Sequence, residues 1–220
     1  MPNLARRTLL AGAAAALVAP QARAEVTVPL AEGWREQRFP RRIPNRFGFA
    51  PDGIDILSDG GVSLALHPLP ETAWGMRRAA WFWSVAEGVP PTDLTRRGGD
   101  DRNLALYALF LPEGDARRLS GAGTMRVMGA RSARVIVYTW GGRAGGPRMF
   151  ANPWLDGRGV TVVLRPAGTG RFAETADLAA DARRAFGEAP AALVGLALSA
   201  DSDDTGGRIR ARIEGLRLTA

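Results

Sequence analysis

The feature that most constrains the fold of this chain is a repeated alternation of apolar and polar residues, interrupted by clusters of Gly, Pro and Asp. Alternation with a period of two places every second side chain on the same face of a β-strand. A run that is apolar on both faces, at residues 104–111, indicates a central strand covered on two sides. The predicted strands lie at residues 62–67, 80–86, 104–111, 133–140, 160–164, 193–199 and 208–218.

The last run, residues 208–218, contains a change of phase. Apolar residues occupy the odd positions up to Ile213 and the even positions from Leu216. A β-bulge at Glu214 and Gly215 would return all of them to one face. The arginines between the apolar residues then form a charged stripe on the outer face, which we expect to protect the strand from edge-to-edge pairing.

One segment, residues 175–186, has a helical period. Leu178, Ala182 and Phe186 follow one another at a spacing of four, and Gly187 is a typical stop signal. One short helix among many short strands, without regular alternation of the two, predicts an antiparallel β-sandwich of the jelly-roll kind. We expect residues 25–220 to form a single mainly β domain.

Residues 1–24 have the pattern of a secretory signal peptide. Arg6 and Arg7 precede an apolar run at residues 8–18, and an Ala-Arg-Ala sequence supplies the small residues of a cleavage site after Ala24. The apolar run is about half of the roughly 20 residues that a transmembrane helix needs, so no transmembrane anchor is expected. The adjacent arginines favour twin-arginine export. These features predict a periplasmic or secreted protein.

The composition excludes several kinds of chemistry. The chain has no cysteine, and therefore no disulfide, thiol nucleophile or Cys-ligated metal. It contains no lysine, which excludes Schiff-base catalysis and a P-loop lysine. Its one histidine, His67, excludes a multi-histidine metal site and is expected at the surface. The arginines are scattered among acids, so no nucleic-acid partner is expected despite the formal net charge of +7.

Two acidic segments form the first candidate site. Asp100 and Asp101 immediately precede a predicted strand, and Asp201, Asp203 and Asp204 lie in a second segment near the C-terminus. Carboxylates in such loops bind Ca²⁺ or sugar hydroxyl groups, and the second segment supplies the candidate metal ligands. It begins like an EF-hand loop, but an arginine at its twelfth position excludes that motif. The alternative is that both segments are turns whose carboxylates accept backbone hydrogen bonds. No cofactor is required; Ca²⁺ is the one candidate.

Aromatic residues and one further acid extend the candidate site. Trp140 ends a predicted strand and Trp154 lies in a loop, so both are expected at the rim of the sandwich, where sugar rings stack on indoles. Trp81 and Trp83 alternate with apolar residues and are expected in the core. The candidate ligand-binding residues are Asp100, Asp101, Tyr138, Trp140, Trp154 and Glu174.

Four motifs follow one another along the chain. They are Trp-Phe-Trp at 81–83, Gly-Gly-Asp-Asp at 98–101, Tyr-Thr-Trp at 138–140 and Asp-Ser-Asp-Asp-Thr-Gly at 201–206. Their order resembles a bacterial family known as domain of unknown function 3047, in which the last motif usually reads Asp-x-Asp-Asn-Thr, so Asp204 departs from it. The resemblance implies an exported protein, a sandwich related to galactose-binding-like domains, and a shared structural or binding role for the two acidic motifs. It implies no established activity.

Three functions fit these observations. The leading hypothesis is a periplasmic module that binds a glycan or cell-envelope polysaccharide through rim tryptophans and acidic loops. The second is a carboxylate-dependent polysaccharide lyase or hydrolase, although no local spacing demands a catalytic pair. Its acids would come from Asp100, Asp101, Glu174, Asp201 and Asp203, with Tyr138 as another proton donor. The third is a structural or protein-interaction domain. The oligomeric state is left open.

Overall fold

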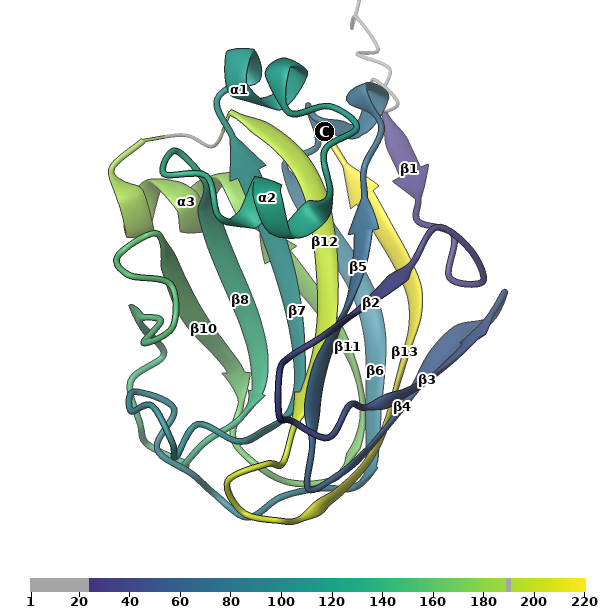
Figure 1. Ribbon diagram of the computed structural model, residues 1–220, viewed down its shortest axis with the longest axis vertical. Coiled ribbons are helices and arrows are strands. Elements are labelled where there is room, and N and C mark those ends of the chain that lie inside the picture. The colour runs from purple at the N-terminus through teal and green to yellow at the C-terminus, as the bar shows by residue number, and fades with distance from the viewer. Residues whose placement is uncertain (1–23, 189–190) are drawn as a thin grey trace, which may run out of the picture.

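Two β-sheets packed face to face make up most of the computed structural model, which describes residues 24–188 and 191–220 (Figure 1). Apart from Ala24, the predicted signal peptide lies outside the described residues. Within the described part of the chain, no helix is both long and apolar enough to cross a membrane.

Sheet A has six strands in the order β11-β6-β13-β4-β3, with β1 paired to β13. Its strands are β1 (Glu25–Thr27), β3 (Arg46–Ala50), β4 (Gly53–Asp59), β6 (Arg78–Glu87), β11 (Gly170–Asp177) and β13 (Arg208–Thr219). Sheet B has seven strands in the order β2-β5-β12-β7-β8-β10-β9. Its strands are β2 (Arg35–Arg38), β5 (Val62–Pro68), β7 (Arg102–Leu111), β8 (Arg134–Gly141), β9 (Met149–Ala151), β10 (Gly159–Arg165) and β12 (Ala192–Asp201).

The predicted mainly β, antiparallel sandwich is confirmed, and each of the predicted runs is a strand. The β8–β10 pair is parallel, because the short strand β9 and its connections separate the two strands in sequence. The bulge predicted in β13 is present as a shift of register against β6 between Glu214 and Arg217, with Gly215 at φ +58°. The idea that the arginine stripe of β13 protects an edge is wrong, because β13 lies between β6 and β4.

The predicted helix is α3 (Leu178–Phe186), which begins later than expected because residues 175–177 still pair with β6. The side chain of Asp177 caps it by accepting a 2.9 Å hydrogen bond from the backbone N–H of Ala180. The structure also contains the helices α1 (Glu113–Arg118) and α2 (Thr124–Met128) and the 3₁₀ turn η1 (Glu71–Ala73). These elements were not predicted, because a helix of one or two turns is too short to show a period.

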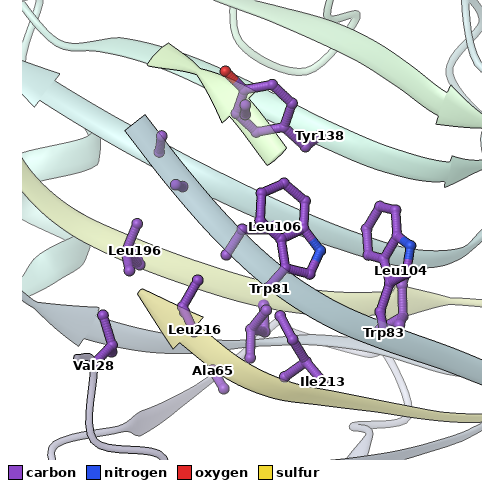
Figure 2. Packing of buried hydrophobic residues seen from close by; sticks show 14 of the residues in the cluster. Val28, Ala65, Trp81, Trp83, Leu104, Leu106, Tyr138, Leu196, Ile213 and Leu216 are labelled. Carbon is purple, nitrogen blue, oxygen red and sulfur yellow. The ribbon is translucent and has the colours of Figure 1, made fainter. Parts of the chain in front are cut away.

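The space between the sheets is filled by large apolar side chains (Figure 2). Trp81 and Trp83 are each 1% exposed, which confirms their predicted place in the core. Their rings meet edge to face with centroids 5.5 Å apart, a favourable aromatic geometry. On the opposite face of sheet B, α1 and α2 help to cover β7 with a second apolar cluster that includes Leu109 and Leu119. The central strand β7 is therefore buried on both faces, as predicted.

The surface position expected for His67 is wrong, because the side chain is only 6% exposed. Its ring packs against Trp34, from the segment before β2, with ring centroids 5.0 Å apart. A side chain at Gly33 would collide with the imidazole, so this close approach requires glycine. Burial lowers the pKa of His67, which favours the neutral form of the imidazole.

Candidate functional site

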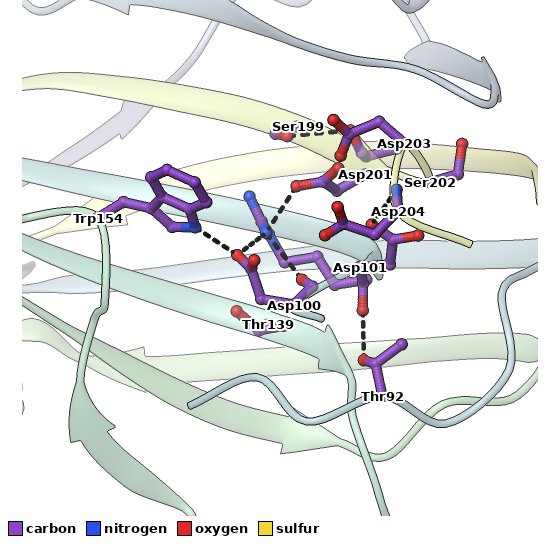
Figure 3. Close-up of polar contacts among 12 residues, drawn as sticks. Thr92, Asp100, Asp101, Thr139, Trp154, Ser199, Asp201, Ser202, Asp203 and Asp204 are labelled. Carbon is purple, nitrogen blue, oxygen red and sulfur yellow. Dashed lines mark hydrogen bonds and ion pairs between the residues drawn. The ribbon is translucent and has the colours of Figure 1, made fainter. Parts of the chain in front are cut away.

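The two acidic segments meet at one end of the sandwich, the lower end in Figure 1. They meet because β7 and β12 are antiparallel neighbours: Arg102, at the start of β7, pairs with Asp201, at the end of β12. Asp100 and Asp101 lie just before this pair and Asp203 just after it, so strand pairing brings together motifs that are far apart in the sequence (Figure 3).

A β-bulge at the start of β7 sets the direction of Arg102. Between two points of pairing, Asp201 with Arg102 and Ser199 with Ala105, β7 contains one residue more than β12. Residues five apart normally point to opposite faces of a strand, but after a one-residue bulge they share a face. Arg102 accordingly donates a 2.8 Å hydrogen bond to the hydroxyl of Tyr107, on the outer face of sheet B.

Arg102 lies between two carboxylates. Its Nη1 donates to Asp201 Oδ2 at 3.0 Å and to Asp100 Oδ2 at 3.3 Å. The Arg102 side chain is 12% exposed, so both ion pairs are largely shielded from water. Arg102 and Asp201 are 99 residues apart in the sequence, so their ion pair has no local signal.

Asp101 is completely buried, and it accepts hydrogen bonds from the loop after β12. Its partners are the backbone N–H of Asp204 at 3.2 Å and the backbone N–H and hydroxyl of Thr205 at 2.7 and 2.6 Å. The Asp101 side chain therefore holds the β12–β13 loop in place, a structural role.

Asp201 is 7% exposed, and its second oxygen, Oδ1, has no hydrogen-bond partner among the described residues. The pKa of Asp201 is raised to about 8, mainly by burial; nearby Asp203 and Asp101 add to this rise, whereas Arg102 opposes it. Asp203 forms an ion pair with Arg42, a contact between distant segments that has no local signal in the sequence. One oxygen from each of Asp101, Asp201 and Asp203 lies within 4.8 Å of the others.

Asp204, a predicted metal ligand, lies outside this group of three, and its residue is exposed. The pKa of Asp204 is raised, first because its carboxyl group is partly buried and second because other carboxylates lie near it. The predicted set of metal ligands was Asp201, Asp203 and Asp204. The carboxylates that cluster are Asp201, Asp203 and Asp101, because the strand pairing brings Asp101 beneath the loop.

Trp154 lies at the rim of this end, as predicted, and is 50% exposed. Its indole N–H donates a 2.7 Å hydrogen bond to Asp100 Oδ2. The guanidinium carbon of Arg97 lies 5.0 Å from the centre of the indole ring, and Arg97 also bonds to the backbone carbonyl of Pro153 and to Asp156. The ring is therefore held in one orientation while half of its surface is accessible.

The rim position predicted for Trp140 is wrong, because this residue is 1% exposed. Its ring lies between Trp83 and Phe172, with centroids 5.7 and 5.2 Å away. Tyr138 is also fully buried and donates a 3.0 Å hydrogen bond to Asp181 of α3; burial raises the pKa of its hydroxyl. Tyr138 and Trp140 are two residues apart on β8, so both point to its inner face. The Gly-rich loop begins only after Trp140 and does not alter the direction of this side chain.

Glu174 belongs to a different environment from the acidic loops. It lies in the middle of β11, where it accepts hydrogen bonds from the indole of Trp83 and from Arg165. The guanidinium of Arg165 also stacks on Phe172, 3.6 Å from the ring centre. Of the candidate residues, the structure brings Asp100, Asp101, Trp154 and the acids of the β12–β13 loop together, while Tyr138, Trp140 and Glu174 contact the sandwich interior.

Solved structures to which this chain is similar include a xyloglucanase domain and a family 11 xylanase. The xyloglucanase domain of NopAA, a type three effector from Sinorhizobium fredii solved in complex with cellobiose, is 9% identical, with a TM-score of 0.46 over 90% of this chain and 99% of that chain. The family 11 xylanase from Neocallimastix patriciarum is 10% identical, with a TM-score of 0.39 over 90% of this chain and 100% of that chain. No curated protein matches the chain.

The family resemblance seen in the sequence motifs is confirmed by a match over almost the entire sandwich. The model of a family described as "Protein of unknown function (DUF3047)" matches residues 32–217, which include both acidic loops and the tryptophans of the core and rim. This chain therefore belongs to the DUF3047 family.

Proposed function

We propose that this protein is a glycan-binding module of the cell envelope, and that the end of the sandwich carrying Trp154 contacts the glycan. The observation that carries the proposal is the fixed, half-exposed indole of Trp154, bonded to Asp100 and flanked by Arg97. Sugar rings stack their C–H faces on indoles, while carboxylate and guanidinium groups bond to hydroxyls. A side chain that is already held in place loses little conformational entropy when a ligand binds.

The proposal is tested by retention on columns of insoluble polysaccharides and peptidoglycan. Trp154→Ala is expected to weaken retention by about thirtyfold, the effect of losing a central aromatic contact worth about 2 kcal/mol. Phe49→Ala is the matched control, because Phe49 is an aromatic residue 37% exposed on β3 of the other sheet. Equal retention of the two variants would remove Trp154 from the site. No retention of the unmodified protein on any column would favour a protein-interaction domain instead.

Catalysis by carboxylates is less well supported than binding. Asp201 would hold a proton near neutral pH, as a general acid must, because its pKa is raised to about 8. However, the residue is only 7% exposed and its Oδ2 already accepts a hydrogen bond from Arg102, which leaves little access for a polymer. Release of reducing ends or unsaturated products from the retained polysaccharide would overturn this preference for binding.

We also propose that the module acts in the periplasm or outside the cell after twin-arginine export. The support is the arrangement of Arg6 and Arg7 before the short apolar run. Replacing both by lysine is expected to leave the protein in the cytoplasmic fraction, whereas Arg23→Lys, the matched control, is expected to be exported normally. Export of the double variant at the normal level would contradict the twin-arginine route.

A further inference from the structure

We infer that Asp101, Asp201 and Asp203 bind one divalent cation, Ca²⁺ in preference to Mg²⁺, beneath the β12–β13 loop. The inference is independent of glycan binding. One oxygen from each residue lies within 4.8 Å of the other two. Oxygens this close to one another can all contact one ion. Ca²⁺ accepts six to eight oxygen ligands in a flexible geometry, whereas Mg²⁺ demands a near-ideal octahedron, so a set of carboxylates from two separate segments suits Ca²⁺ better.

The buried oxygen of Asp201 is the observation that distinguishes this cluster from an ordinary group of surface acids. Asp201 is nine-tenths buried, and its Oδ1 has no hydrogen-bond partner among the described residues. An unsatisfied buried carboxylate oxygen is costly, because it has lost its water and gained nothing in return. The same carboxyl group contributes one oxygen to the group shared with Asp101 and Asp203, so a cation bound there would lie against Asp201.

Carboxyl groups outnumber the guanidinium groups that pair with them in this cluster. Arg102 pairs with Asp100 and Asp201, and Arg42 pairs with Asp203, while Asp101 accepts hydrogen bonds from the loop. When all of these carboxyl groups are ionised, negative charge is in excess. A divalent cation offsets this excess, which matters most where the groups are shielded from water.

The three proposed ligands are already held by other groups. Arg102 bonds to Oδ2 of Asp201, Arg42 pairs with Oδ2 of Asp203, and backbone N–H groups of the loop bond to Asp101. Such outer contacts orient ligands before the metal arrives and tune its affinity. Water and backbone carbonyls would complete the six to eight oxygens that Ca²⁺ takes.

Calorimetric titration of the purified, chelator-treated chain with CaCl₂ and with MgCl₂ tests the inference. One equivalent of Ca²⁺ is expected to bind, more tightly than Mg²⁺. Ca²⁺ at a hundredfold excess over its dissociation constant is expected to raise the thermal midpoint by roughly 5–10 °C. Absence of binding, or equal affinity for the two ions, would overturn the inference.

Two variants with the same chemical change identify the ligands. Asp201→Asn is expected to weaken Ca²⁺ binding by about tenfold or more, because one ligand loses its charge. Asp204→Asn, in the same loop but outside the cluster, is expected to bind Ca²⁺ as tightly as the unmodified chain. If both variants lose affinity equally, the site is not the one assigned.

The Asp201→Asn variant is expected to fold without metal, because its amide can donate a hydrogen bond to Asp203. The comparison of affinities therefore does not depend on lost stability. Because no glycan is present, this result is separate from the column experiment.

Discussion

Asp101 accepts hydrogen bonds from both the backbone N–H and the hydroxyl of Thr205, at 2.7 and 2.6 Å, across a separation of 104 residues. This pair connects the segment before β7 to the loop after β12. The turn interpretation of the Asp101 segment was right about the kind of bond, a carboxylate accepting from backbone amides. It did not identify the partner, Thr205, which lies in the C-terminal part of the chain.

Asp101→Ala is expected to lower the free energy of unfolding by about 2–4 kcal/mol, because it leaves partly buried N–H groups of the loop without acceptors. Urea unfolding in the presence of a chelator measures this effect without any contribution from a cation. The control is Asp59→Ala, whose carboxylate is 77% exposed; it is expected to change stability by less than about 0.5 kcal/mol. A similar small change in both variants would contradict a structural role for Asp101.

Trp140→Ala is expected to lower stability by about 3–5 kcal/mol, because it leaves a cavity between Trp83 and Phe172 in the core. Thermal unfolding followed by circular dichroism measures the loss. Trp154→Ala is the comparison, because it removes an exposed ring and is expected to cost only about 1 kcal/mol through the lost bond to Asp100. Equal midpoints for the two variants would show that Trp140 does not support the core.

Stability is expected to fall in mild acid through His67. Burial lowers the pKa of the folded imidazole below its ordinary value. The unfolded chain then binds a proton more readily than the folded one, so the free energy of unfolding decreases as the pH falls below about 6.5 and levels off below the folded pKa. Urea midpoints of the unmodified protein and of His67→Gln across this range separate the effect from carboxylate titrations. Parallel pH profiles would exclude His67 as the cause.

Gly215→Ala is expected to cost about 1–2 kcal/mol, because the residue has φ +58° in the bulge of β13 and a Cβ is disfavoured there. Gly114→Ala is the matched control: Gly114 lies in α1 with no atom near the position of a new Cβ. Alanine favours helices by up to about 1 kcal/mol over glycine, so this variant is expected to be equally or more stable. Destabilisation of the same size at both positions would argue against strain at the bulge.

The strands that could be predicted from the sequence are those with strong alternation or continuous burial. β13 was predicted with its bulge because its apolar residues change phase at Gly215. The short strands β2 and β9 have no comparable pattern: they lie at the edges of sheet B, where few side chains are buried. The order of strands within each sheet is set by contacts between distant segments and has no local signal.

The candidate site was predicted as separate residues rather than as an arrangement. The acidic segments were recognised from their residues alone. They come together only because β7 pairs with β12, two strands that lie far apart in the sequence: Asp101 and Thr205 are 104 residues apart. Trp140 was misplaced because the residue before a loop can still belong to the strand face that points inward. Trp154 was placed correctly because its position after Asn152 and Pro153 is typical of an exposed turn.

The single extra residue in β7 decides to which face of sheet B Arg102 points. Without this residue, Arg102 and Tyr107 would lie on opposite faces of the strand, and Arg102 would point toward the apolar space between the sheets. Asp201 would then lose its cationic neighbour, although every acid of the loops would still be present in the sequence. A variant that kept all the aspartates but lacked the bulge would thus have the same motif and a different site, because the phase of one strand positions the arginine among the acids.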